Sequence, residues 1–192
     1  MKILKKILLW LVIVIAVISV AAQFLPAKWT VTRTVVVNAQ PASIYPLLVN
    51  IKNWQQWNAF STKDPAIEHA YPTVDAGPGA KDFWKSKKFG DGNATITQAD
   101  PATGIEFELR FDRMPNAVSP AEMKFSPVNG GTQITYTVSG KHGHNPAHRI
   151  FGLFMDKFLG PMFDESLANV KRLAEATPAA PAQIAPAAPA VP

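Results

Sequence analysis

The sequence contains no cysteine. This absence excludes a disulfide framework, a metal site built on thiolates and a cysteine nucleophile. Three other signatures of enzymes are also missing: a serine-nucleophile motif, a glycine-rich phosphate-binding loop and a pair of carboxylates with a plausible catalytic geometry. There is no internal repeat either. These absences favour a binding protein over an enzyme, and the sequence predicts no cofactor.

An excess of charge of one sign is also lacking from the part of the chain that can fold. The formal net charge is +5, but Lys2, Lys5 and Lys6 precede the first apolar segment, and without them 16 basic residues stand against 14 acidic ones. A nucleic-acid interface needs a basic surface. We therefore expect no nucleic-acid partner, and the sequence identifies no protein partner.

The apolar run over residues 7–25 is interrupted only by Ser19 and Gln23. As a helix it just spans a bilayer core of about 30 Å. The lysines before it place the N-terminus in the cytoplasm and the following domain on the extracytoplasmic, periplasmic side of a bacterial inner membrane. A signal peptide cleaved after residues 20–22 is the alternative. We favour the single-pass anchor because the run exceeds a usual signal core of about 7 to 15 residues.

The middle of the chain reads as strands separated by turns at short intervals, which is typical of an antiparallel sheet. In residues 105–112 apolar and charged side chains alternate, so this strand has one buried face and one solvent-exposed face. Two short helices are expected over residues 41–49 and 53–60. The predicted strands cover residues 30–38, 67–73, 82–89, 92–100, 104–113, 122–128 and 131–140.

A long helix is predicted over residues 150–174, where apolar residues recur every three or four positions. Its apolar stripe is too wide to remain in water, and the upstream strands offer a sheet that can cover it. Gly160-Pro161 interrupts the pattern, because proline inside a helix loses a hydrogen bond and clashes one turn back. The phase of the stripe continues past the dipeptide, so we expect a kink or a fresh helical start there rather than a loop.

The segment over residues 177–192 consists almost entirely of alanine and proline. It buries too little surface to fold, and its prolines favour extended conformations. We interpret it as an unstructured tail, with a semi-rigid spacer or a ligand for a partner as the alternative.

This order of elements, together with several local motifs, resembles the membrane-anchored bacterial members of the SRPBCC superfamily, also called START-like or polyketide cyclase/dehydrase-like proteins. The motifs are Asn-Trp-Gln-Gln-Trp-Asn-Ala-Phe at residues 53–60, Gly-Pro-Gly at 77–79 ahead of Trp84, Gly131-Thr132 before the last strand, and Asp156, Gly160, Phe163, Leu167 and Leu173 in the final helix.

The resemblance implies an α+β helix-grip fold, in which a curved antiparallel sheet of about seven strands wraps around a long C-terminal helix. It divides the chain into an anchor or signal peptide (1–28), a helix-grip domain (29–176) and the tail (177–192). It also implies a largely apolar cavity between helix and sheet for lipids, polyketides or other hydrophobic molecules. One fold hosts many chemistries, so no activity follows from it.

Aromatic side chains are the candidate ligand-binding residues, because they are expected to face the space between sheet and helix. The same residues also suit an ordinary packed core, which is the alternative interpretation. The candidates are Trp57, Trp84, Phe107, Phe111, Phe125, Tyr136, Phe154 and Phe158.

Two weaker hypotheses concern polar residues. His142, His144 and His148 have a spacing compatible with a transition-metal site, although Gly143 and Asn145-Pro146 between them favour a solvated loop. Asp156 and Tyr136 are the candidate acid–base groups, with an ion pair to Lys157 or Lys88 as the alternative role of Asp156.

We therefore expect a non-enzymatic, membrane-anchored module that holds a hydrophobic small molecule or lipid. An enzyme of the cyclase/dehydrase type, using Asp156, Tyr136 or the histidines, is the second hypothesis. The third is an interaction or stress-related scaffold whose cavity is filled by its own side chains. A void of about 300 Å³ or more beneath the last helix favours binding, and a filled interior favours the scaffold.

Overall fold

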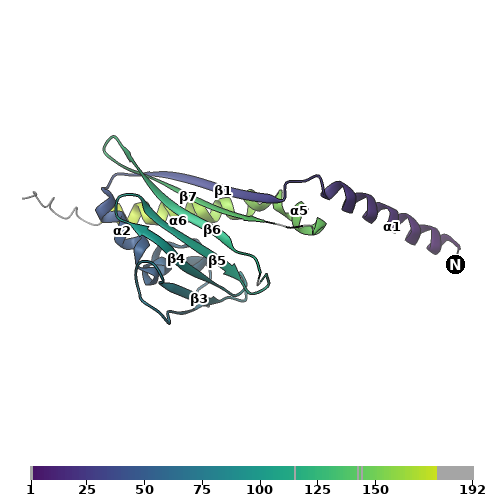
Figure 1. The fold of residues 1–192 in the computed structure, drawn as a ribbon, viewed down its shortest axis with the longest axis horizontal. Coiled ribbons are helices and arrows are strands. Elements are labelled where there is room, and N and C mark those ends of the chain that lie inside the picture. The colour runs from purple at the N-terminus through teal and green to yellow at the C-terminus, as the bar shows by residue number, and fades with distance from the viewer. Residues whose placement is uncertain (1, 115, 142, 144, 177–192) are drawn as a thin grey trace, which may run out of the picture.

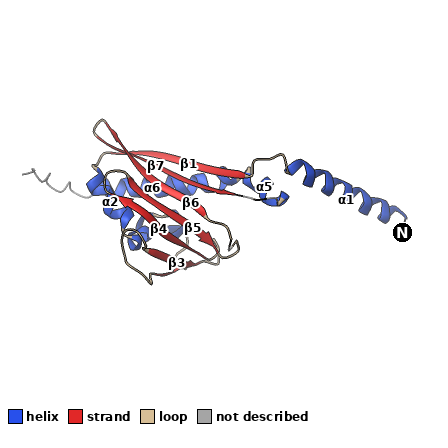
Figure 2. Cartoon of the chain, in the orientation of Figure 1, coloured by secondary structure: helices blue, strands red, loops and turns tan. Residues whose placement is uncertain are grey.

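The computed structural model describes residues 2–114, 116–141, 143 and 145–176. Seven strands form one antiparallel sheet in the order β1-β7-β6-β5-β4-β3-β2, and the helices that follow β1 and β7 lie against one of its faces (Figures 1 and 2). This arrangement confirms the predicted α+β helix-grip fold. The strands are β1 (Lys28–Val37), β2 (Glu68–Ala70), β3 (Lys81–Lys85), β4 (Gly92–Asp100), β5 (Gly104–Phe111), β6 (Ser119–Val128) and β7 (Gly131–Lys141).

The alternation read from the sequence matches the burial of the strands. In β5 Ile105 and Phe107 are buried, while Glu106 and Glu108 between them are partly exposed. In β7 every second residue from Thr132 to Gly140 is buried. The face that carries these residues packs against the helices, because strand side chains point to opposite faces in turn.

The first helix, α1 (Lys2–Ala22), extends away from the sheet (Figure 1). Among the described residues it is the one helix that is long and apolar enough to cross a membrane, with a mean hydropathy of 2.6 over Ile3–Ala22 and Ala22 as its one buried residue. Apolar side chains exposed on all sides of a helix are what a bilayer, rather than a protein core, accommodates.

Short helices connect β1 to β2. The predicted second helix over residues 53–60 is divided at Asn58, whose side chain accepts a hydrogen bond from the backbone N–H of Phe60 and caps a new helix. Asparagine is a strong helix N-cap, so the chain restarts there. The helices after α1 are α2 (Pro41–Val49), η1 (Ile51–Asn53), α3 (Trp54–Trp57), α4 (Ala59–Lys63), α5 (Pro146–Gly152) and α6 (Met155–Ala176).

Of the two alternatives expected at Gly160-Pro161, the fresh helical start is wrong, and the kink stays a prediction. The helix α6 continues through Gly160 and Pro161, and the fresh start lies earlier, between α5 and α6. There, Leu153 and Phe154 donate short-range turn hydrogen bonds to the carbonyls of Ile150 and Phe151, at 3.2 and 2.9 Å. Pro161 lies on the exposed side of the helix, where water can replace the hydrogen bond that proline does not donate.

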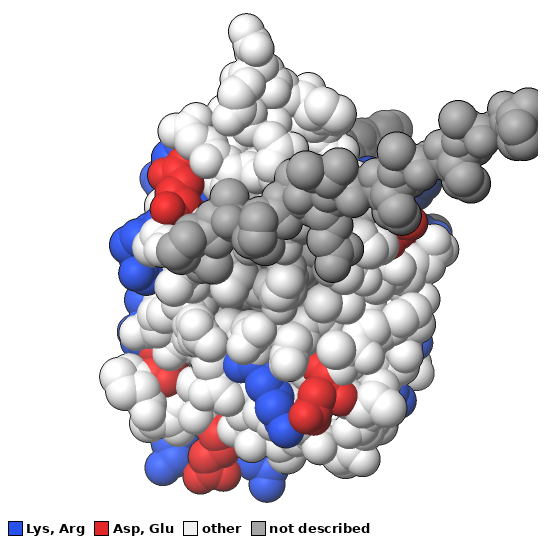
Figure 3. Space-filling view, turned by 90° about the vertical axis from the view of Figure 1, so that its left-hand side faces the viewer, with Lys and Arg blue, Asp and Glu red and all other residues white. Residues whose placement is uncertain are grey.

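Residues of α6 cover the inner face of the sheet near β1 and β7. Phe163, Leu167 and Val170 are at most 2% exposed. The opposite end of the domain from α1 faces the viewer in Figure 3, where basic and acidic side chains lie beside one another without a broad region of one sign. This mixed surface agrees with the near-neutral charge of the folded part.

Candidate functional site

The candidate site is the space between α6 and the inner face of the sheet, where aromatic side chains meet. The Tyr136 ring of β7 stacks on the Phe163 ring of α6, with 4.3 Å between ring centroids. The Phe107 ring of β5 lies 6.2 Å from that of Tyr136, and its edge meets the Trp54 ring at 4.8 Å. Four elements therefore contribute one continuous aromatic cluster, and their side chains fill this space.

Tyr136 is the polar member of this cluster. It is only 6% exposed, and within the described part of the chain its hydroxyl group has no hydrogen-bond partner. Burial raises the pKa of Tyr136 far above its ordinary value, so the hydroxyl stays protonated at neutral pH. A buried hydroxyl without a partner costs free energy, and it is therefore a ready donor to an oxygen atom brought in by a ligand.

Trp57, another predicted ligand residue, is buried and fixed by a hydrogen bond to the backbone. It is 1% exposed, and its indole Nε1 donates to the backbone carbonyl of Leu47 at 2.9 Å. Trp54 beside it donates in the same way to Leu48 at 2.7 Å. The polar atoms of both indoles are thus satisfied by the backbone of α2, and these rings offer only apolar surface to a ligand.

Two more predicted residues, Trp84 and Phe111, lie on the sheet away from Tyr136, whereas a third, Phe125, lies opposite Ile134 on the same face as Tyr136. The Trp84 ring meets the edge of the Phe111 ring at 5.9 Å and donates its indole N–H to the carbonyl of Gly90 at 3.0 Å. Both side chains are partly buried, whereas Phe125 on β6 is 8% exposed and belongs to the core. The structure therefore divides the predicted set into a central cluster and a peripheral pair.

Phe154 and Phe158 correct the expectation that all eight aromatic residues face the interior. They are 54% and 57% exposed. The reason is the break between α5 and α6, because Phe154 lies in that turn and the stripe that packs on the sheet is fully buried only from Gly160 and Phe163 onward. The regular spacing continued through the break, but the buried face did not.

Asp156 lies outside the aromatic cluster. Its carboxylate is paired with the guanidinium group of Arg33 through two hydrogen bonds of 2.7 and 3.0 Å, instead of with Lys157 or Lys88. These bonds lower the pKa of Asp156 below its ordinary value. A carboxylate engaged in this way on the surface is a poor general base, so the geometry gives Asp156 a structural role.

The histidine hypothesis falls largely outside the described residues, which exclude His142 and His144. His148 is exposed on α5. Among the residues that are described, no group of three or more histidine and acidic side chains is placed to hold a metal ion.

A cluster that the sequence analysis missed surrounds the fourth histidine, His69 on β2. Its Nδ1 lies 2.9 Å from both carboxylate oxygens of Asp82, and its Nε2 lies 3.4 Å from Ser61 Oγ. The order resembles a serine nucleophile with its base and its orienting acid. However, the backbone N–H groups of Ser61 and Thr62 both donate to the carbonyl of Asn58 and are not free to stabilise an oxyanion.

We therefore interpret the His69 cluster as a structural network between β2, β3 and α4. One signal in the sequence could have revealed it. Asp82 occupies an inward position of a predicted strand, two residues before Trp84, and a carboxylate there needs a partner when it is buried.

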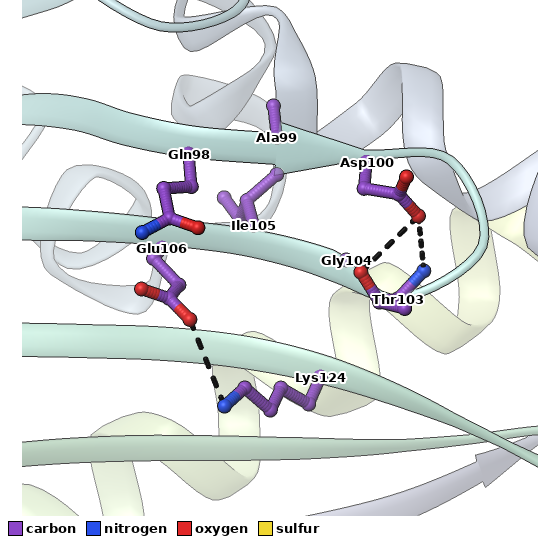
Figure 4. A pocket seen from close by; sticks show the side chains of 8 residues that line it. All are labelled: Gln98, Ala99, Asp100, Thr103, Gly104, Ile105, Glu106 and Lys124. Atoms are coloured by element: carbon purple, nitrogen blue, oxygen red, sulfur yellow. Dashed lines mark hydrogen bonds and ion pairs between the residues drawn. The ribbon is translucent and has the colours of Figure 1, made fainter.

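Two hollows of the surface lie elsewhere. The first, of about 100 Å³, lies between the β4–β5 hairpin and β6, and Figure 4 shows its ion pair between Glu106 and Lys124 and the hydrogen bonds that join Asp100 and Thr103. The second, of about 740 Å³, has a rim of charged residues that includes Asp64, Lys87 and Arg113. Neither is lined by a predicted ligand residue, and charged side chains contribute to the lining of both.

Residues 28–175 match the family described as polyketide cyclase / dehydrase and lipid transport. No curated protein matches the chain in sequence.

Several solved structures are similar in fold. Protein CV1439 from Chromobacterium violaceum is 16% identical with a TM-score of 0.57, over 77% of this chain and 98% of that one. The Aha1 dimer from Colwellia psychrerythraea is 13% identical with a TM-score of 0.53, over 77% and 96% of the two chains. Protein Ms6760 from Mycobacterium smegmatis is 20% identical with a TM-score of 0.52, over 77% and 91%. At these identities the likeness concerns the fold.

Proposed function

Because the chain belongs to the polyketide cyclase / dehydrase and lipid transport family, we propose that it is a membrane-anchored module that binds a hydrophobic small molecule or lipid between α6 and the sheet. The domain stands on the periplasmic side of a bacterial inner membrane, with α1 as its single span. The module acts by holding its ligand and not by transforming it.

The observation that carries this proposal is the Tyr136 hydroxyl. It is a protonated donor without a partner among the described residues, and it is surrounded by the rings of Phe107 and Phe163. Such a site suits a molecule that is mostly apolar and carries one oxygen atom. The rings contact its apolar body, and Tyr136 orients its oxygen.

Space for the ligand comes from side chains that can move. Met155, Leu159 and Met162 of α6 are partly buried at the margin of the core. Methionine is unbranched and adapts its shape easily, so these residues can turn outward when a ligand enters. The filled interior is, in this proposal, the closed form of the site.

Separate observations on α1 support its role as a membrane anchor. Within the span Ile3–Ala22 the side chains before Ala22 are largely exposed, and lysines at positions 5 and 6 lie toward its N-terminal end. Basic residues remain on the cytoplasmic side, so the domain that follows α1 is exported. An anchor of this kind keeps the site beside a source of hydrophobic ligand.

The test uses the full chain extracted from membranes in a mild detergent. Native mass spectrometry is expected to show a lipid or other hydrophobic adduct. A brominated long-chain fatty alcohol is then expected to quench the tryptophan fluorescence of a chain that carries Trp10→Phe and Trp29→Phe, because Trp54 and Trp57 line the same cluster. Tyr136→Phe should weaken this binding about tenfold, which corresponds to one hydrogen bond of roughly 1.4 kcal/mol.

The matched control is Tyr45→Phe, which removes the hydroxyl of a partly exposed tyrosine on α2 and should leave the binding unchanged. Equal affinities of the original chain and Tyr136→Phe would contradict the role of Tyr136.

The second candidate function is the closed scaffold, and the filled space between α6 and the sheet favours it. If the extracted chain has no adduct and the brominated alcohol does not quench its fluorescence, the binding proposal is wrong and the scaffold remains. A scaffold needs its interior only for stability, so ligand addition would then leave the free energy of unfolding unchanged.

A further inference from the structure

The segment that joins α5 to α6 exposes an unusual amount of apolar surface. We call residues 146–158 the elbow. Phe151, Leu153, Phe154 and Phe158 are each between 53% and 57% exposed, and the rings of Phe151 and Phe158 lie 6.5 Å apart. Single apolar residues on a surface need no explanation, but a patch of neighbouring ones marks a surface that binds something.

The elbow is fastened to the C-terminal end of α1. The guanidinium group of Arg149 is buried and donates to the backbone carbonyls of Gln23 and Leu25, the latter at 3.2 Å. Its Nε also donates to the carbonyl of Gly143 at 2.8 Å. Ala22, the last residue of α1, is 2% exposed, and α5 packs against α1 (Figure 1). The patch is therefore held at the point where the chain leaves its anchor.

The position of the patch identifies its partner as lipid. The apolar surface of α1 continues through Phe24, which is 86% exposed, to the elbow beside it. A surface next to the end of a membrane-spanning helix lies at the level of the headgroups, where amphipathic segments bury aromatic side chains at the boundary with the acyl chains. A second copy of the chain would have to reach the patch from within this crowded layer.

The charges around the patch agree with a lipid surface. Lys157 is exposed on the elbow. Lys28 and Lys141 are also exposed, and they face each other in the backbone register at the ends of β1 and β7 that are nearest in the chain to α1 and α5. Asp156, the acidic residue of the elbow, is neutralised by Arg33. Basic side chains around an apolar patch complement the phosphate groups of anionic lipids.

We infer that the elbow is a membrane-docking surface, which inserts Phe151, Leu153, Phe154 and Phe158 into the headgroup boundary of the leaflet that α1 leaves. This inference rests on the anchor in the proposed function and does not need the ligand. Docking holds the first turns of α6 against lipid and fixes the orientation of the domain on the membrane. It also places Met155 and Leu159, at the edge of the candidate site, next to the bilayer.

The absence of cysteine makes a direct test possible, because an introduced cysteine is a unique site for a fluorescent label. The full chain is placed in nanodiscs of phosphatidylethanolamine and phosphatidylglycerol, with a nitroxide quencher attached to the lipid near its ester groups. Three variants carry the label: Phe154→Cys in the elbow, Val14→Cys in α1, and Val36→Cys near the far end of β1. Val36 is a matched control because it is an apolar residue that is 44% exposed.

Labels at positions 154 and 14 are expected to lose fluorescence to the lipid quencher, and the label at 36 is expected to keep it. Quenching at 14 without quenching at 154 would overturn the docking surface while leaving the anchor intact. No quenching at 14 would overturn the anchor, and the docking surface with it. Neither result depends on whether the interior binds a ligand.

A second pair of variants tests the chemistry of the patch. Phe158→Glu is expected to reduce the quenching of the label at 154, because a carboxylate resists transfer into the acyl boundary. Thr34→Glu, on an exposed position of β1, should leave it unchanged. If the fluorescence at 154 instead changes only when two copies share one nanodisc, the patch is an interface between copies and the inference is wrong.

Discussion

The guanidinium group of Arg33 lies directly against Gly160, so a Cβ atom at that position would require the Arg33 side chain to move. From β1 the Arg33 side chain crosses α6 between two carboxylates, Asp156 at 2.7 Å and Asp164 at 3.2 Å. The edge strand and the long helix are thus joined by an ion-pair cluster that depends on the absence of a side chain at Gly160.

We expect the effect of Gly160→Ala on the free energy of unfolding to depend on the residue at position 33, and to have opposite signs with arginine and with methionine there. In the original chain the new methyl group displaces the Arg33 side chain, so the substitution lowers the free energy of unfolding. In an Arg33→Met background the charged contacts are already gone, and alanine should stabilise the helix by roughly 0.5–1 kcal/mol relative to glycine. Urea unfolding of the full chain in detergent measures both effects.

The control is Ala168→Gly on the exposed side of the same helix. It should cost about 1 kcal/mol in both backgrounds, because it has no contact with Arg33. If Gly160→Ala had the same sign in both backgrounds, the proposed dependence on Arg33 would be wrong.

The pairing of Asp156 with Arg33 predicts a dependence of stability on pH. Hydrogen bonds from Arg33 lower the pKa of Asp156 below its ordinary value of 3.8, so the unfolded chain binds a proton at this site more readily than the folded chain. The stabilisation is complete above the unfolded pKa and disappears as the pH falls through the folded one. Asp156→Asn should therefore be less stable than the original chain at neutral pH, with the difference vanishing in acid.

Thermal unfolding of both chains at several pH values measures this difference. Asp112→Asn, at an exposed carboxylate on the rim of the domain, is the control and should unfold like the original chain throughout. A gap between the original chain and Asp156→Asn that persisted at strongly acidic pH would contradict the ion pair as its cause.

Tyr136→Phe and Ser166→Ala each remove one buried hydroxyl, but they should affect stability in opposite ways. The Tyr136 hydroxyl has no partner among the described residues, so its removal should be neutral or stabilise the chain by up to about 1 kcal/mol. Ser166 Oγ accepts from the N–H of Ala59 at 2.9 Å and donates to the carbonyl of Met162 at 2.8 Å. Its loss should cost about 1–3 kcal/mol, because the N–H of Ala59 is then buried without a partner.

Denaturant unfolding of the ligand-free chain gives both values. Destabilisation by Tyr136→Phe of the same size as that by Ser166→Ala would mean that the hydroxyl is satisfied, and the proposed ligand contact would lose its basis.

The cluster around His69 is expected to stabilise the fold without catalysing a reaction. Asp82→Ala should lower the free energy of unfolding by about 1–3 kcal/mol, because it removes the partner of a buried imidazole. Ser61→Ala should change it by less than about 0.5 kcal/mol. A fluorophosphonate probe, which labels activated serines, should not react with the chain. Labelling that disappears in Ser61→Ala would show a nucleophile instead.

Much of the fold was predictable because it depends on local patterns. The strand at residues 92–100 and the helix at 41–49 have the predicted limits, since glycine, aspartate and proline mark their ends. The error about Phe154 and Phe158 has a different origin. Periodicity identifies a helix and its apolar face, but it does not show which turns of that face reach the sheet, so Phe154 and Phe158 were assigned to the interior.

The sequence predicted that aromatic residues face the interior at the candidate site, but not which of them contact one another. Phe107 and Tyr136 were recognised as inward-facing aromatic residues, whereas the stacking of Tyr136 on Phe163 joins positions on a strand and a helix that no local pattern connects. The ion pairs of Arg33, the network of His69 and the contacts of Arg149 were missed for the same reason. Each joins residues from different elements, and their meeting depends on how those elements pack.

By itself the sequence determined the order of the elements, the alternation that gives the sheet one buried face, and an N-terminal helix whose apolar surface is unfavourable in water. These follow from the chemistry of neighbouring residues along the chain. The packing of α6 on the sheet alone decided that Tyr136 has no hydrogen-bond partner among the described residues and that four large apolar side chains of the elbow remain exposed. Burial is a property of surfaces brought together from distant parts of the chain, so it exists only once the tertiary structure has formed.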